Sequence, residues 1–393
     1  MSHANADASI KTDREGSLIK RNVPLCIPDM CDDEINAIAA VLKSGWLAHG
    51  ASNHEFEKMF AELVGVPHAV SLNSCASALF LAVHASGIKG EIILPSFTFV
   101  ASANAVVTGG AKCVFADIDY DTCCIDPGHA ESLITRHTEA IMPVHFGGQA
   151  ADMARISALA QKHNLKIIED SAEAIGATCG GRQTGSWGIG CWSFYPTKNI
   201  ATGEGGMLTT TDASLAERAR AIAGHGVASS TWAREKKEKP WLRAATHAGF
   251  NFRMSNILAA LGVVQLKKLE RMNAHRRRHA AQLNTLLKRD LFELPVEAKD
   301  RTHVYQMYTI KLKRGDRTRF LADLRARGIG ATVHFDPPVH TQPFYAQLGF
   351  GELALPVTQK VASTIVTLPM YPTMSEDDVS FVAEAANTVA AQC

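Results

Sequence analysis

Short apolar runs alternate with stretches of helical periodicity over the first part of the chain. The segments 68–72, 91–95, 112–116, 139–144 and 165–170 are almost continuously apolar and have the length of strands buried on both faces. Apolar residues recur with helical spacing between them, at 53–64, 76–87, 98–108 and 151–163. This alternation predicts an α/β fold in which helices cover both faces of a mainly parallel sheet.

The pattern changes after residue 254. Residues 255–287 keep helical spacing without a breaker, 303–312 have the composition of a strand, and 317–328 have helical spacing and end at a glycine. We therefore expect a disordered tail at 1–20 and a large domain at 21–254. Residues 255–393 would form a long connecting helix and a smaller α+β domain.

Composition narrows the class of protein. The 393 residues carry a net charge of +1, and the basic runs 234–239 and 276–278 are typical of solvated surface, so nucleic acid is not an expected partner. The nine cysteines form no CxxC pair and show no zinc-site spacing, which predicts reduced thiols and no metal.

The polar N-terminus lacks the apolar core of a signal peptide, and no run is long enough to span a bilayer. A cytoplasmic protein without membrane contact is expected.

Lys198 is the first candidate for chemistry. It lies in the run 191–206, after a strand-like apolar stretch and shortly before Gly203, Gly205 and Gly206. Most lysines are solvated surface residues, but glycines let the backbone come close to a ligand. A lysine amine held in such a pocket can react with an aldehyde.

Asp170 ends the predicted strand at 165–170. It could simply cap a following helix. It could also pair with the pyridine nitrogen of pyridoxal 5′-phosphate (PLP), which would keep that nitrogen protonated. The segment 73–79 adds small residues between a strand and a helix, either as a phosphate site or as an ordinary helix cap. No Walker or GxGxxG motif is present.

These motifs, taken in order, resemble one family. From about residue 25 onward the chain is similar to the DegT/DnrJ/EryC1/StrS sugar aminotransferases, which are PLP-dependent enzymes of fold type I. This fold has a large domain with a mainly parallel mixed sheet flanked by helices and a smaller α+β C-terminal domain. The matching stretches are 45–50, 73–79, 95–104, 145–153, 169–177, 193–206, 249–266 and 368–375.

The resemblance implies a role for each matching position. Lys198 would hold the cofactor covalently, and Asp170 would contact its pyridine nitrogen. The other implied cofactor contacts come from Ala76, Ser77, Phe99, Glu173, Ser193 and, across a homodimer with shared active sites, Asn251. His334 would lie on the substrate side. His225 and Arg253 could bind charges of the donor or nucleotide or be structural, and Trp46 and the loop 224–248 would shape specificity.

The chain departs from the common family pattern at two places. Many relatives have Ser-Gly-Thr where this chain has Ser74, Cys75 and Ala76, so a hydroxyl is missing beside the phosphate. Many have glutamine in place of Glu173, near the phenolic oxygen of the cofactor. Either Glu173 is protonated there or it contacts the substrate.

The resemblance predicts a ping-pong transaminase. Glutamate or glutamine would donate nitrogen, and a nucleotide-linked keto-deoxysugar would accept it. An acceptor that is a cyclic ketone without a nucleotide, such as an inosose, is the nearest alternative. A dehydratase of the family is less favoured because those relatives commonly have histidine in place of the lysine. A non-catalytic sensor is disfavoured by the intact lysine and aspartate.

Overall fold

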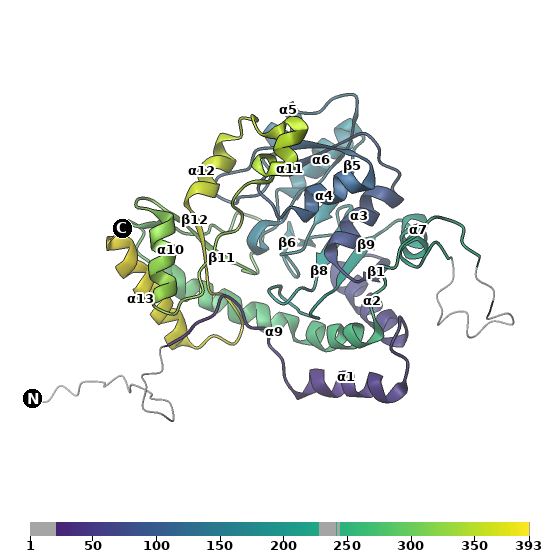
Figure 1. Ribbon diagram of the computed structural model, residues 1–393, viewed down its shortest axis with the longest axis horizontal. Helices are drawn as coiled ribbons and strands as arrows, with labels where there is room; N and C mark the ends of the chain where they lie inside the picture. Colours follow the sequence, from purple (N-terminus) through teal and green to yellow (C-terminus); the bar gives the residue numbers. More distant parts are fainter. Residues whose placement is uncertain (1–20, 228–240, 242–243, 393) are drawn as a thin grey trace, which may run out of the picture.

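A seven-stranded sheet forms the centre of the larger part of the protein (Figure 1). The computed structural model describes residues 21–227, 241 and 244–392. The strand order is β1-β9-β8-β5-β4-β2-β3, and every pairing is parallel except those of β9 with its two neighbours. The strands are β1 (His68–Leu72), β2 (Glu91–Pro95), β3 (Lys112–Ala116), β4 (Thr138–Ile141), β5 (Lys166–Asp170), β8 (Ile189–Ser193) and β9 (Gly206–Thr210).

Helices cover both faces of this sheet, which is why its strands are apolar on both sides. One face packs against α3 (Cys75–Ala85), α4 (Ala101–Gly109) and α7 (Ala213–Ala223). The other packs against α2 (Ala51–Val64), α6 (Met153–His163) and the first half of α9 (Asn256–Leu286). The α/β fold expected from the alternating pattern is confirmed.

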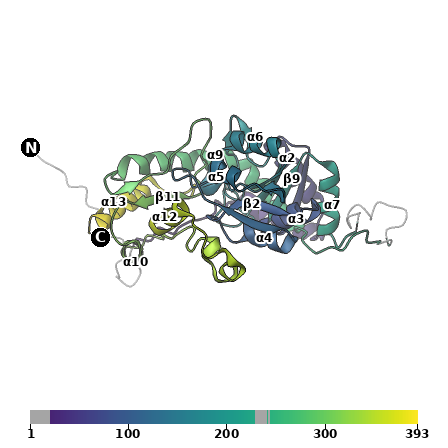
Figure 2. The same ribbon diagram turned by 90° about the horizontal axis from the view of Figure 1, so that it is seen from above.

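The long helix α9 joins the two parts of the molecule. Its first half packs against α1 (Asp32–Ser44) and α2, and its second half against α13 (Glu376–Gln392). A second core forms there around an antiparallel sheet of β10 (Phe292–Glu293), β11 (Tyr308–Leu312) and β12 (Ile365–Leu368), together with α10 (Arg317–Ala326). Figure 2 shows this group at the opposite end from α3 and α7.

The smaller elements lie in the connections. They are α5 (Pro127–Ser132), the 3₁₀ helices η1 (Phe146–Gly148) and η2 (Val339–Thr341), the hairpin of β6 (Thr178–Cys179) and β7 (Arg182–Gln183), α11 (Pro343–Tyr345), the π-helix η3 (Ala346–Phe350) and α12 (Pro356–Thr364). Val23 packs in the second core and pairs with Ile329, so the start of the described chain belongs with the C-terminal elements in space. The domain limits drawn from the sequence stay predictions, and the tail expected at 1–20 lies outside the described residues.

Two segments begin several residues later than the sequence pattern predicts. The strand expected at 303–312 begins only at Tyr308, because the backbone N–H groups of Val304 and Met307 donate to Gly148 and Gly147 instead of to a strand. The helix expected at 98–108 begins at Ala101, since residues 96–99 form a loop beside a cavity. No helix in the described part of the chain is both long and apolar enough to cross a bilayer.

Candidate active site

A cavity of about 490 Å³ lies between the two parts of the molecule. The larger part contributes the ends of β5 and β8, the start of α3 and the loop after β8. The second part contributes Gln306, Met307, His334, Phe335, Thr367, Leu368 and Met370. The cavity is therefore at the carboxyl edge of the parallel strands, where ligands of such sheets bind.

Asp170 is the last residue of β5 and lines this cavity. Its Oδ2 accepts a hydrogen bond from Ser102 Oγ at 2.7 Å and its Oδ1 one from the backbone N–H of Ala172 at 3.2 Å. Burial raises the pKa of this carboxyl, and the neighbouring Glu173 raises it further. A turn follows β5, so Asp170 does not cap a helix. A cationic hydrogen-bond donor in the cavity would compensate its charge.

Lys198 reaches the same cavity from the loop between β8 and β9. Its Nζ lies 3.3 Å from Glu173 Oε1, and Glu173 Oε2 accepts the backbone N–H of Gly147 at 2.9 Å. Both side chains are largely buried, with 15% and 7% exposed. The lysine amine is therefore held beside a carboxylate that can take or return a proton.

The first turn of α3 forms another wall. Ser74 caps the helix by accepting the N–H of Ser77 at 3.1 Å, and Cys75 and Ala76 face the cavity at the positive end of the helix dipole. Gly206, at the start of β9, approaches so closely that a Cβ there would lie 2.3 Å from the carbonyl carbon of Ser74. Ser193 at the end of β8 also lines this wall. Backbone N–H groups with a serine hydroxyl suit a phosphate.

Aromatic and imidazole side chains complete the cavity. Phe99 is 60% exposed, and its ring centroid lies 6.2 Å from that of Phe335. His334 Nδ1 lies 2.9 Å from Thr367 Oγ1, and burial lowers the pKa of His334, which favours the neutral ring. Phe99 can thus stack on a flat ring, and His334 faces the cavity from the second part of the molecule.

Five residues singled out in the sequence do not line this cavity. Asn251, Arg253 and His225 form their own cluster, in which Arg253 Nε donates to Asn251 Oδ1 at 3.1 Å and Arg253 Nη2 lies 3.5 Å from His225 Nε2. Trp46 donates from Nε1 to the carbonyl of His49 at 3.1 Å. Ser77 is also off the cavity surface, because its N–H and Oγ bond within the α3 cap. Their roles stay predictions. Within the loop 224–248, residues 228–240 and 242–243 lie outside the described residues.

Some cavity residues had little or no sequence signal of their own. Cys26 and Leu25 come from the start of the chain, and Gln306 lies between two ordinary-looking segments. Gln306 Nε2 donates to the carbonyl of Thr197 at 2.8 Å, next to Lys198. Only the folding of the second part onto the first brings these residues to the cavity. The polar Gln306 in an otherwise apolar run was the one available hint.

Comparison with known proteins agrees with this geometry. Residues 28–387 match the DegT/DnrJ/EryC1/StrS aminotransferase family. The chain belongs to this family. It is 40% identical to the spore coat polysaccharide biosynthesis protein SpsC of Bacillus subtilis, over 94% of this chain and 98% of SpsC.

Solved structures of aminotransferases share the fold as well. The aminotransferase TlmJ of Streptoalloteichus hindustanus superposes with a TM-score of 0.88 at 30% identity, covering 95% of this chain and all of TlmJ. PseC of Helicobacter pylori superposes with a TM-score of 0.89 at 27% identity, covering 95% of this chain and 100% of PseC. PseC is an aminotransferase involved in the biosynthesis of pseudoaminic acid. This chain is a PLP-dependent aminotransferase of fold type I.

The residues present fit the cofactor that the family uses. The buried carboxylate of Asp170 accepts hydrogen bonds from the Ser102 hydroxyl and the Ala172 N–H. It has room for one more donor, such as a protonated pyridine nitrogen. The α3 N-terminus with Ser193 suits the phosphate, Phe99 suits a ring face, and Lys198 is placed for covalent attachment. When bound, PLP draws electrons away from the carbon at which nitrogen is exchanged. The Lys198 amine would be placed to carry a proton to or from that carbon, with Glu173 beside its Nζ.

Proposed function

We propose that this aminotransferase transfers an amino group from glutamate or glutamine to a nucleotide-linked keto-deoxysugar. The product would be an amino sugar for a surface polysaccharide or a glycosylated metabolite. The observation that carries the proposal is the match to SpsC over nearly the full length of both chains, since SpsC is named for spore coat polysaccharide biosynthesis. PseC, with the same fold, is named as an aminotransferase involved in the biosynthesis of pseudoaminic acid.

The chemistry of the cavity supports an exchange in two stages, in which nitrogen is taken from the donor first and passed to the acceptor second. Lys198, Asp170 and Glu173 are all on its surface, so one amine and two carboxylates serve both stages. His334 and Gln306 approach from the second part of the molecule and offer polar atoms to hydroxyl groups of a sugar. The neutral His334 ring can accept or donate a hydrogen bond without carrying a charge.

The remaining proposals concern assembly and place in the cell. We propose a cytoplasmic homodimer in which Asn251 of the partner subunit reaches the cofactor phosphate, with Arg253 and His225 beside it. In this chain the Arg253 side chain contacts both Asn251 and His225 away from the cavity, as residues serving a neighbouring site would. Trp46 and the loop 224–248 would then shape the nucleotide subsite.

A panel of ligands tests the acceptor class by thermal unfolding. We expect UDP-, GDP- or dTDP-sugars to raise the unfolding temperature of the PLP-loaded protein, with one nucleotide giving the largest rise. Ligand at about 100 times its dissociation constant adds about 2.7 kcal/mol to the free energy of unfolding, which is readily measured. An inosose is the matched control. A rise with the inosose and none with any nucleotide sugar would contradict the nucleotide-linked acceptor.

A further inference from the structure

A buried histidine–carboxylate pair lies behind the cofactor cavity. Glu169 directly precedes Asp170 on β5, so the two side chains point to opposite faces of the sheet. Asp170 faces the cavity, whereas Glu169 contacts His145 with an Nε2–Oε2 distance of 3.1 Å. Both side chains of this pair are fully buried. The exchange chemistry described so far uses neither of them.

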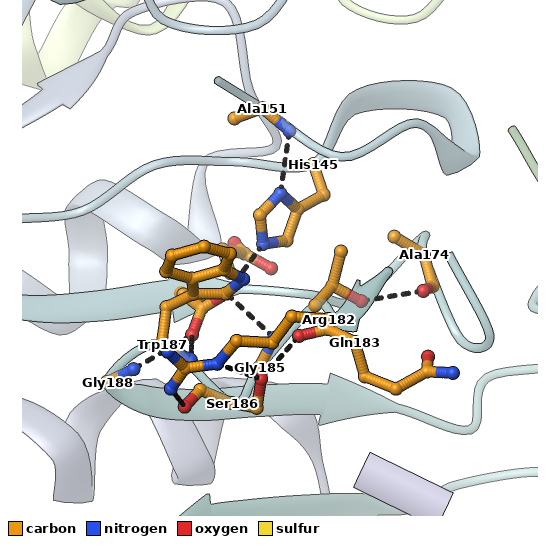
Figure 3. A network of polar contacts seen from close by, with 12 residues as sticks. His145, Ala151, Ala174, Arg182, Gln183, Gly185, Ser186, Trp187 and Gly188 are labelled. Carbon is orange, nitrogen blue, oxygen red and sulfur yellow. Dashed lines mark hydrogen bonds and ion pairs between the residues drawn. The ribbon is translucent and has the colours of Figure 1, made fainter. Parts of the chain in front are cut away.

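All acceptor positions of Glu169 are filled. Oε1 accepts the backbone N–H groups of Trp187 at 2.7 Å and Gly188 at 3.0 Å, and Oε2 accepts that of Gly185 at 2.7 Å in addition to His145 (Figure 3). An ionised carboxylate offers about four such positions. Gly185 has φ +71° and a Cβ there would lie 2.1 Å from the Trp192 ring, so the turn that supplies these donors has little freedom.

His145 has a defined tautomer. Its Nδ1 accepts the backbone N–H of Ala151 at 3.0 Å, so the ring hydrogen is on Nε2 and is donated to Glu169. Figure 3 shows the ring between Ala151 and the turn at 185–188. The backbone of the same residue bonds to the neighbouring strand, because His145 N–H donates to the carbonyl of Asp170 at 3.1 Å. Asp170 N–H in turn donates to Pro143 at 2.9 Å.

The Nδ1 atom of His145 supports the loop that holds Glu173, the other carboxylate of the cavity. The bond from Ala151 closes the loop 146–150, and Gly147 within that loop donates its N–H to Glu173 at 2.9 Å. Glu173 is the ion-pair partner of Lys198. One imidazole ring thus lies between the backbone segments that aim Asp170 and Glu173 at the cofactor.

We propose that His145 and Glu169 are positioning residues that fix the direction of Asp170 toward the pyridine nitrogen. This inference rests on the proposed role of Asp170. Catalytic groups need their geometry held to within about 0.5 Å, which requires supporting hydrogen bonds behind them. Packing alone would not require a charged carboxylate here, since an ion in the interior costs free energy that an apolar side chain of equal size avoids.

The test compares two cofactors that differ only at the atom Asp170 would contact. The full-length apoprotein is titrated with PLP and with 1-deazapyridoxal 5′-phosphate, in which C–H replaces the pyridine nitrogen, and the ratio of their dissociation constants is measured. For the wild type we expect PLP to bind at least about tenfold more tightly, because a hydrogen bond to a charged group is present only with PLP.

Two substitutions of His145 separate its contacts. Asparagine places an oxygen near the former Nδ1, so His145→Asn keeps the bond from Ala151 and loses the donor to Glu169. His145→Gln places an amide near the former Nε2 and keeps that donor. We expect the cofactor ratio to fall to about threefold or less in His145→Asn and to stay near the wild-type value in His145→Gln. Glu169→Gln, which leaves two donors without an acceptor, should lower the ratio too.

His279→Asn is the matched control, since His279 is a buried histidine on α9 whose Nε2 lies 3.4 Å from the carbonyl of Pro372. It should leave the ratio unchanged. A wild-type ratio in both His145→Asn and Glu169→Gln would overturn the positioning role. An equal fall of the cofactor ratio in His145→Gln or in His279→Asn would also overturn the positioning role, because the fall would then come from general destabilisation. A ratio near one in the wild type itself would instead contradict the role of Asp170, and this inference with it.

Discussion

Replacing Lys198 by alanine is expected to abolish covalent cofactor attachment and to lower turnover by at least about 10⁴-fold. In the proposed mechanism the amine has two tasks, because it would hold the cofactor and then move the proton during nitrogen exchange. Its Nζ lies 3.3 Å from Glu173, in a wall that offers no second lysine among the residues lining the cavity. Alanine removes both tasks and leaves Glu173 without its ion-pair partner.

The attachment is measured by borohydride reduction of the loaded protein, followed by peptide mass spectrometry. The wild type should carry the reduced cofactor on the peptide that contains Lys198, and Lys198→Ala should carry none. Lys58→Ala is the control, since Lys58 is 78% exposed and far from any assigned role. Labelling of Lys198→Ala at another lysine, with turnover near the wild-type rate, would contradict the assignment.

Asp170→Asn is expected to lower turnover by about 100-fold while part of the cofactor still binds. Asparagine has nearly the same shape and can still accept the hydrogen bond from Ser102, but it does not hold a proton on the pyridine nitrogen. Without that proton the ring withdraws electrons less effectively. Asp126→Asn is the control, because asparagine also caps helices well and Asp126 caps α5. Turnover of Asp170→Asn near the wild-type rate would contradict the role.

Asp170→Asn is expected to raise the stability of the apoprotein although it lowers turnover. Burial raises the pKa of Asp170, so its charged form opposes folding of the apoprotein. The contribution of the protonated carboxyl to the stability of the folded apoprotein is fully present below the ordinary pKa of an aspartate. It is lost as the pH rises through the raised pKa of Asp170. At neutral pH the apoprotein with Asp170→Asn should therefore unfold at a higher temperature than the wild type. At pH values below the ordinary aspartate pKa the two should converge.

The sequence was informative where chemistry depends on neighbours along the chain. The buried strands are apolar on both faces, so their positions followed from the pattern, and Asp170 followed as the end of one of them. Lys198 stood out because a glycine cluster follows it closely. These signals are local, and the structure places both residues on one cavity.

What could not be predicted depends on contacts between distant segments. Gln306 and Cys26 reach the cavity only because the second part of the molecule folds over the first. The pairing of Glu173 with Lys198 depends on the loop between β8 and β9, which no periodicity describes. His145 and Glu169 appear in the sequence as a histidine in one motif and a strand residue in another. Their contact forms only when two parallel strands become neighbours.

The most direct test of the proposed function is the second half of the exchange. The enzyme is first incubated with glutamate until the cofactor is fully aminated, freed of donor, and mixed with the nucleotide-linked keto-deoxysugar preferred in the ligand panel. We predict one amino sugar formed per cofactor, detected by mass spectrometry, with return of the aldehyde form of the cofactor in its absorption spectrum. An aminated enzyme that keeps its nitrogen with every nucleotide-linked keto-sugar, but passes it to an inosose, would contradict the proposal.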